Sequence, residues 1–269
     1  MDEGYFVGAI LGDGGMTSCT PEFHGDPADG VVSFTRTLAA EYGCGVREIP
    51  SGSIVRLRFP HLSGRRNPLT QCLRRFGVWG QSCAEKHLPD ELFSRDFWIG
   101  CLSGLIDTDG HVRERRNPKG TIHSSVEYAT VSPVLARQVA DALLRLGVTS
   151  RHRVIERHSE TAHWINGNRI KGRRPIHIVE VSRATAVVRL ANLLHLRIGY
   201  KASKLEGVAR AVGHVETARS DMHGYDASVA LDRVTNIRRA GRERVFSLDV
   251  GPASLFIVNG LVTGASRRS

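Results

Sequence analysis

No stretch of this 269-residue chain comes near the run of about eighteen apolar residues that a membrane-spanning helix needs. The chain begins Met1-Asp2-Glu3, which is acidic where a secretory signal is basic. We therefore expect a cytoplasmic protein without a membrane partner.

Paired cysteines are also lacking, because the five cysteines at positions 19, 44, 72, 83 and 101 form no C-x-x-C motif. An odd number of cysteines in a chain without a secretion signal argues against a disulfide framework and against a zinc site. We interpret the five as small hydrophobic residues or as residues without a specific role.

Lysine is scarce as well, with five lysines among 37 basic residues. The basic residues outnumber the 27 acidic ones, which gives a net charge of +10 and a pI near 9.9. Such a charge favours an anionic partner such as nucleic acid. Arginine binds phosphate and guanine in a bidentate manner, which lysine cannot do.

Two segments of the chain repeat with a period of 96 residues. Residues 6–14 read FVGAILGDG and residues 102–110 read LSGLIDTDG, so that Asp13 and Asp109 coincide at this offset, since 109 − 13 = 96. The same offset superimposes four further identical pairs, which are Gly4 with Gly100, Gly8 with Gly104, Ile10 with Ile106, and Gly14 with Gly110. The chain is therefore expected to contain two similar halves.

The residues that follow each repeat show the same order of patterns. Helices are predicted at 31–43 and 67–77 in the first half and at 132–147 and 185–196 in the second. Strands are predicted at 54–59, 126–131 and 176–182. Pro68 and Pro133 stand near helix starts, where a missing N–H costs little. Each half therefore reads α-β-β-α-β-β-α, which predicts an α+β fold.

The strand IVRLRF (54–59) would bury Val55, Leu57 and Phe59 on one face and present Arg56 and Arg58 on the other. A two-stranded ribbon with such side chains fits the DNA major groove, although a solvated strand face gives the same pattern. The second half has a similar supply of basic residues. Our predicted DNA-binding residues are Arg56, Arg58, Arg113, Arg115, Arg116, Lys171, Arg173 and Arg174.

Glycines four residues apart in each repeat lie on one helix face, where they let another backbone approach closely. Two helices packed in this way would bring Asp13 and Asp109 together at their ends. Two converging carboxylates repel unless a cation lies between them, and oxygen ligands suit Mg²⁺. We therefore predict that Asp13 and Asp109 bind Mg²⁺, the alternative being that Asp-Gly only ends each helix. An EF-hand is excluded, because Gly110 falls at loop position 4 instead of 6.

The segment LSGLIDTDG resembles the nine-residue motif of LAGLIDADG homing endonucleases in seven positions, and residues 6–14 are similar to its looser first copy. The resemblance implies two αββαββα halves with saddle-shaped antiparallel sheets that straddle DNA. It implies that Asp13 and Asp109, at the eighth motif position, bind the catalytic metal. Asp107 stands at the sixth position, where the first copy has Leu11, so no catalytic role is transferred to it.

The resemblance extends to the endonuclease insert of inteins. Lys86, in the sequence KHLP, matches the catalytic lysine of the block between the two motifs, and Lys201, in GYKASK, lies where the second half would have its own lysine. Each lysine could polarise the attacking water or stabilise charge on the phosphate, or could be an ordinary surface ammonium.

The segment 244–266 resembles the C-terminal splicing blocks of inteins, which form strands of the Hint fold. That family ends in His-Asn followed by Ser, Thr or Cys, whereas this chain has Gly264, Ala265 and Ser266. Ala265 has no amide that could cyclise and Gly264 has no imidazole, so splicing is not expected. The expected domains are an endonuclease at 1–207, with halves 1–85 and 86–207, and a splicing remnant at 208–269.

The sequence thus predicts a monomeric, Mg²⁺-dependent nuclease of double-stranded DNA, associated with the nucleoid when bound. Three alternatives stay open. These are a non-cleaving nucleic-acid binder such as a maturase or a transcription regulator, the C-terminal part of an intein that needs an N-terminal intein fragment, and an inert remnant.

Overall fold

The computed structural model describes residues 1–60, 66–118, 122–156, 162–165, 168–171, 174–216, 236–239, 241–242, 255–258 and 261–264. The chain divides into two compact units, Met1–Arg219 and Ser220–Ser269. In the second unit, the described strands β11 (Leu255–Val258) and β12 (Leu261–Gly264) form an antiparallel hairpin. Within the described ranges, no helix is both long enough and apolar enough to span a membrane.

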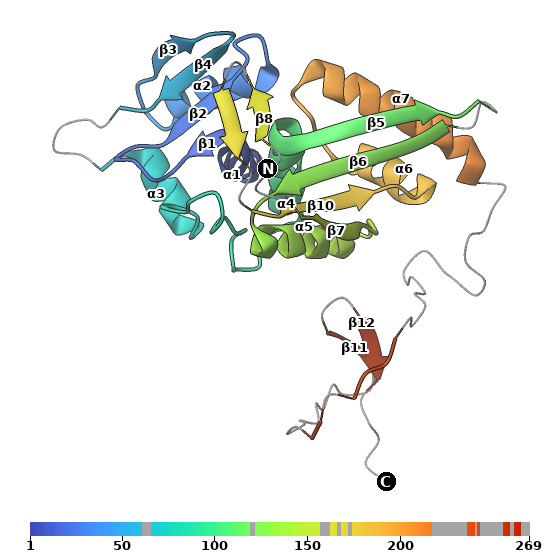
Figure 1. Ribbon diagram of the computed structural model, residues 1–269. Helices are drawn as coiled ribbons and strands as arrows, with labels where there is room; N and C mark the ends of the chain where they lie inside the picture. Colours follow the sequence, from blue (N-terminus) through green and yellow to red (C-terminus); the bar gives the residue numbers. More distant parts are fainter. Residues whose placement is uncertain are drawn as a thin grey trace. The chain divides into compact units, whose positions relative to one another are not determined.

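The first unit begins with a half that is built around one four-stranded sheet (Figure 1). Its strands follow the order β1-β2-β4-β3 and all pair antiparallel. The elements are α1 (Asp2–Asp13), β1 (Gly14–Gly15), β2 (Glu22–Gly25), α2 (Gly30–Glu41), β3 (Arg47–Ser51), β4 (Ile54–Arg58) and α3 (Pro68–Arg75).

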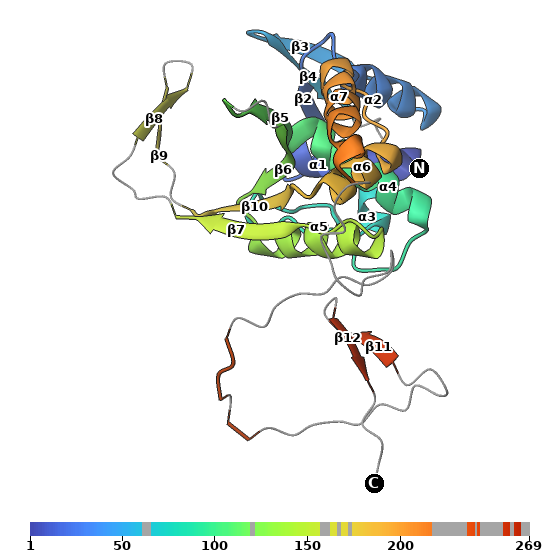
Figure 2. The same cartoon turned by 90° about the vertical axis from the view of Figure 1, so that its right-hand side faces the viewer.

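The second half repeats this topology with the sheet order β5-β6-β10-β7, again antiparallel throughout. Helices α5, α6 and α7 cover one face of this sheet (Figure 2). The elements are α4 (Arg95–Asp109), β5 (Gly110–Arg116), β6 (Ile122–Thr130), α5 (Pro133–Arg145), β7 (Arg151–Ile155), β8 (Ala162–Ile165), β9 (Asn168–Lys171), β10 (Ile176–Val181), α6 (Ala184–Leu193) and α7 (Gly199–Glu216).

The predicted α+β class is confirmed, with αββαββα order in the first half and the same order in the second after two additions are removed. One addition is the β8–β9 hairpin, which lies between β7 and β10, where the first half connects β3 to β4 through Gly52 and Ser53 alone. The other is α7, which follows α6 and includes the domain boundary expected at residue 207. Neither addition belongs to the repeat, so the repeat could not predict them.

Both predicted proline-marked helix starts are confirmed. Asn67 caps α3 by accepting a hydrogen bond from the Thr70 N–H at 3.0 Å, and Pro68 is the first helical residue. Ser132 caps α5 in the same way, with the Leu135 N–H at 3.1 Å. The side-chain oxygens satisfy N–H groups that the first turn leaves without intrahelical partners.

The centre of the first unit is the contact between α1 and α4, which lie side by side in Figure 1. A Cβ atom added at Gly8 would lie 2.0 Å from the carbonyl oxygen of Cys101, and one added at Gly104 would lie 2.3 Å from that of Tyr5. Both helices are buried along almost their whole length. The prediction that glycines four residues apart allow close helix packing is therefore confirmed. A side chain at these positions would prevent the contact between the two backbones.

We predict that Gly104→Ala lowers the free energy of unfolding by about 3 kcal/mol, because the new methyl group meets backbone atoms that cannot move aside. Urea denaturation measures the change. The control is Gly207→Ala in α7, where an added Cβ has open space. There we expect a gain of up to about 1 kcal/mol from helix propensity. Equal effects of the two substitutions would contradict the close backbone contact between α1 and α4.

Candidate active site between the two halves

Asp13 is the last residue of α1 and Asp109 is the last residue of α4, so the packing of these two helices determines where both carboxylates lie. Both side chains are reached by solvent, although protein atoms surround them on most sides. Burial and the neighbouring Asp13 raise the pKa of Asp109 to about 6. Burial also raises the pKa of Asp13. The two carboxylates are therefore close enough to interact, as the repeat predicted.

Lys86 and Lys201 join these carboxylates at the helix ends, and both are buried, with exposed fractions of 9% and 7%. Burial lowers the pKa of each ammonium group, while Asp13 and Asp109 act on both in the opposite direction. The sequence predicted these four charged residues as the site, and in the structure each lysine lies within electrostatic reach of both carboxylates.

Each lysine donates hydrogen bonds to the C-terminal carbonyls of one motif helix. Lys86 Nζ lies 2.8 Å from the Gly12 oxygen of α1. Lys201 Nζ contacts four carbonyl oxygens at the end of α4. They belong to Ile106 at 3.1 Å, Asp107 at 2.5 Å, Thr108 at 3.3 Å and Gly110 at 2.8 Å. A cation at a helix C-terminus also stabilises the helix dipole. Lys201 therefore makes more hydrogen bonds to its helix end than Lys86 makes to α1.

The backbone around Lys86 is held by the second half. The hydroxyl of Ser132, which caps α5, donates to the Lys86 carbonyl at 2.6 Å. The Leu88 N–H donates to the Gln138 side chain at 2.7 Å. The sequence identified Ser132 only as part of a helix start, because a contact over 46 residues leaves no local pattern.

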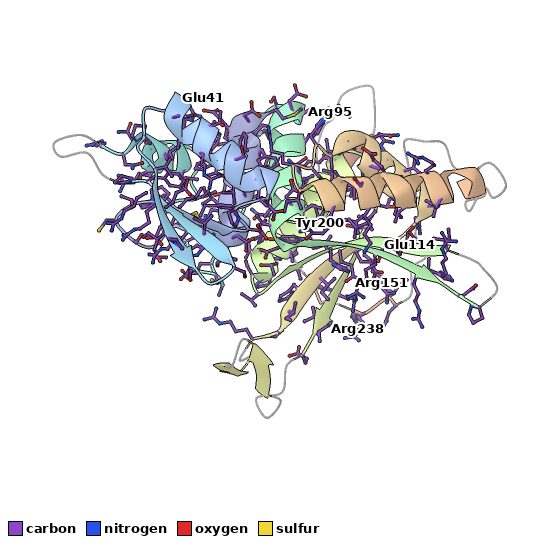
Figure 3. All side chains as sticks on the ribbon, turned by 90° about the horizontal axis from the view of Figure 1, so that it is seen from above. Glu41, Arg95, Glu114, Arg151, Tyr200 and Arg238 are labelled. Atoms are coloured by element: carbon purple, nitrogen blue, oxygen red, sulfur yellow. The ribbon has the colours of Figure 1, made fainter. Side chains whose placement is uncertain are left out.

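Lys201 is positioned by Asp107, which is 1% exposed. The Asp107 carboxylate accepts the Arg197 N–H at 2.6 Å and the Ile198 N–H at 3.3 Å, directly before α7 begins. It also accepts the hydroxyl of Tyr5 from α1 at 2.5 Å. Tyr200, next to Lys201, lies between the two halves in Figure 3. Asp107 thus anchors the start of the helix that carries Lys201, a role the sequence did not reveal.

Arginines from both sheets lie on the faces that the helices leave uncovered, and we call these two surfaces the arginine faces. On β4, Val55 and Leu57 are buried, while Arg56 and Arg58 are partly exposed on the other side, as predicted. Strand alternation puts Arg113 and Arg115 on the second arginine face and Arg116 on the opposite side, where it forms an ion pair with Glu114. Glu22 and Glu127, which the sequence analysis missed, lie among these arginines.

The remaining predicted residues fall near or beyond the limits of the described structure. Arg174 is exposed, and its charge adds to the hydrogen bonds from Ser82 that lower the pKa of Glu85. Lys171 is the last residue of β9, and Gly264 is the last residue of β12. Arg173, Ala265 and Ser266 lie outside the described residues.

The donor set at the helix ends fits a hard divalent cation. Burial, together with the neighbouring Asp13, raises the pKa of Asp109 to about 6, and a cation between the two carboxylates would stabilise their ionised forms. The described part of the chain offers no cluster of three or more His, Cys, Asp or Glu side chains for a metal ion. Asp13 and Asp109 would therefore leave most coordination positions to water or to phosphate oxygens, which suits Mg²⁺.

We predict that Lys201→Met lowers the free energy of unfolding by about 2 to 3 kcal/mol, because the end of α4 loses a charged donor that serves four carbonyls. The matched variant Lys86→Met removes a single such contact and should cost about 1 kcal/mol. Urea denaturation at neutral pH compares the two variants. Equal losses would argue against the structural role of Lys201.

We also predict that the stability of the metal-free protein depends on pH through Asp109. Its folded-state pKa of about 6 lies above that of the unfolded chain, so its stabilising contribution is present at low pH and is lost as the pH rises through 6. In EDTA, wild type should therefore lose stability relative to Asp109→Asn as the pH rises from 3.8, the ordinary pKa of an aspartate, to about 6, and the difference should then stay constant at higher pH. Thermal unfolding measures the difference, and a constant difference between these two pH values would contradict the assignment.

Comparison with known proteins agrees with this architecture. A family model described as a LAGLIDADG-like domain matches residues 96–193. The RecA protein of Mycobacterium tuberculosis is 29% identical over 197 residues, which cover 71% of this chain and 24% of that protein. The replicative DNA helicase DnaB of Rhodothermus marinus is 38% identical over 98 residues, 36% of this chain and 10% of the helicase. The chain thus matches about a quarter of the RecA relative's length.

Among solved structures, the LAGLIDADG meganuclease I-AabMI bound to uncleaved DNA has a similar fold. The TM-score is 0.52 at 10% identity, and the match covers 81% of this chain and 92% of that one. At this identity the likeness concerns the fold alone. The predicted resemblance is confirmed in part: residues 96–193 match the model of a LAGLIDADG-like domain, and the chain has an α+β fold with two antiparallel four-stranded sheets.

Proposed function

We propose that this protein is a site-specific endonuclease of double-stranded DNA, of the homing endonuclease type, that acts as a monomer and requires Mg²⁺. The observation that carries the proposal is the meeting of Asp13, Asp109, Lys86 and Lys201 at the ends of α1 and α4. Two acids and two lysines with perturbed pKa values are typical of a catalytic site.

The arginine faces support duplex DNA as the substrate. The two sheets have equivalent strand orders and stand on either side of the α1–α4 pair, so one duplex could contact both (Figure 1). The net charge of +10 adds attraction for phosphates, which should weaken as salt increases. The meganuclease with the similar fold was solved bound to uncleaved DNA.

The charged residues would divide the chemistry between them. Asp13 and Asp109 would hold the divalent cation, which when bound polarises the phosphodiester and an attacking water. Lys86 and Lys201 would offset the negative charge that develops on the phosphate. Hydrolysis forms a bond from the water oxygen to phosphorus and breaks the bond to the 3′ oxygen, which takes a proton. The products are 3′-hydroxyl and 5′-phosphate ends.

An intein origin is the second part of the proposal. The chain matches segments of RecA, of DnaB and of the helicase Hel308 of Thermococcus kodakarensis, and these segments make up 24%, 10% and 14% of those proteins. A segment shared by otherwise different proteins is what an inserted element would give. The β11–β12 hairpin lies within residues 244–266, whose sequence resembles the C-terminal splicing blocks of inteins. With Gly264 and Ala265 at the end, we propose that splicing has been lost.

The test is cleavage of a plasmid library that carries randomised inserts, with Mg²⁺ present and with EDTA as the blank. Wild type should produce linear plasmids whose sequenced ends share one motif. Asp13→Asn and Asp109→Asn should each reduce cleavage by about a hundredfold or more, because both acids face the same site. Asp90→Asn, an exposed acid outside the site, is the matched control and should cleave as wild type does.

Other outcomes identify the alternatives. Sequence-selective binding without cleavage would favour a non-cleaving maturase or regulator. Ligation of flanking sequences after mixing with an N-terminal intein fragment would favour a split intein. Neither binding nor cleavage at low salt would indicate an inert remnant, and would overturn the proposed function.

A further inference from the structure

Each four-stranded sheet carries one buried carboxylate at the same place on its arginine face. Glu22 on β2 is 6% exposed and Glu127 on β6 is 7% exposed. Strand register makes them equivalent. Glu22 pairs with Gly15, the second residue after Asp13, and Glu127 pairs with His111, the second residue after Asp109. Their separation is 127 − 22 = 105 residues, nine more than the repeat, because the β5–β6 hairpin is longer.

Glu22 holds two arginines of the neighbouring strand β4. Arg56 binds it in a bidentate manner, with Nε 2.7 Å from Oε2 and Nη2 2.6 Å from Oε1. Arg58 adds Nε at 2.9 Å from Oε1. The hydrogen bond from Arg56 and the positive charge of both arginines lower the pKa of Glu22. The carboxylate is therefore ionised at neutral pH and fixes both guanidinium groups.

Glu127 also holds two arginines, but these come from different strands. Arg113 of β5 lies with Nη2 3.3 Å from Oε2, and Arg153 of β7 lies with Nη2 3.4 Å from Oε1. Arg153 also approaches Glu180 of β10 at 3.7 Å. The two halves thus share the buried acid and differ in how the arginines are arranged around it.

A buried acid on a cationic surface has a cost if the surface only attracts phosphates. Each carboxylate cancels one positive charge and occupies donors that could bind the DNA backbone. In return it restricts the orientation of two guanidinium groups, and a fixed orientation is what bidentate recognition of a guanine edge requires. The observed arrangement therefore suits base reading better than general attraction.

We propose that Glu22 and Glu127 are specificity-determining positioning residues, one for each half of the DNA site. Each holds its pair of arginines for contact with base edges. Because the arginines come from β4 in one half and from β5 and β7 in the other, the two half-sites should differ in sequence. The inference rests on the proposed DNA-binding function and concerns its recognition step, which does not depend on cleavage.

The chain offers a matched control in Glu48. This glutamate of β3 forms a bidentate pair with Arg36 of α2, with contacts of 2.6 and 3.0 Å. Glu48 pairs with the buried Leu57, so strand alternation puts it on the side of the sheet that faces the helices. Glu48→Gln changes the net charge by the same amount as Glu22→Gln but leaves the arginine face unaltered.

The experiment is selection of bound sequences from a duplex library with a randomised core, using the full chain without Mg²⁺. Wild type should select a motif with two unlike halves. Glu22→Gln should lose preference in one half, Glu127→Gln in the other, and Glu48→Gln in neither. On a random-sequence duplex, Glu22→Gln should bind roughly threefold to tenfold more tightly, with a salt slope steeper by about one, because freed arginines turn to phosphates.

A second variant guards against simple misfolding. Arg58→Met leaves Glu22 paired with Arg56, and it should lose preference at the same base positions as Glu22→Gln. Thermal unfolding identifies any variant that has lost its fold. If Glu22→Gln keeps the sequence preference of wild type, the inference about Glu22 is wrong but the DNA-binding function stands. The same holds if Glu22→Gln and Glu48→Gln gain equally in affinity for random-sequence duplex. Failure of wild type to bind any duplex overturns the DNA-binding function itself.

Discussion

The rest of this structure depends on one constraint, which is the close approach of the α1 and α4 backbones at their glycines. Gly8 and Gly104 leave no space for a Cβ atom, so α1 and α4 meet at backbone distance along their length. That contact fixes the relative position of the two helix ends. The acids at those ends, and the lysines that bind the last carbonyls, are therefore brought together by packing instead of by any local sequence pattern.

The repeat predicted much of this arrangement from the sequence. The offset of 96 residues identified the two motif helices, the topology of each half and the juxtaposition of Asp13 with Asp109. Such inferences succeed because a repeated pattern of glycines, apolar residues and acids constrains both copies in the same way. Arg56 and Arg58 were assigned to one strand face from simple alternation, and they lie there.

The parts that were missed depend on contacts over long separations or on departures from the repeat. Asp107 works by accepting N–H groups 90 residues away, and Ser132 by donating to a carbonyl 46 residues away. Glu22 and Glu127 are equivalent by strand register, but a constant offset cannot align them, because the two hairpins differ in length. The β8–β9 hairpin and α7 have no counterpart in the first half, so no pattern in that half announced them.

The bond between Tyr5 and Asp107 bears on the history of the chain. In the repeat, Tyr5 corresponds to Cys101, and Asp107 corresponds to Leu11. In a homodimer of two second halves, Asp107 would lie opposite the thiol of Cys101. In a homodimer of two first halves, Tyr5 would lie opposite the alkyl side chain of Leu11. A homodimer of either half would therefore lack the Tyr5–Asp107 hydrogen bond. The Tyr5–Asp107 hydrogen bond therefore requires one copy of each half, which a single polypeptide supplies in a fixed ratio.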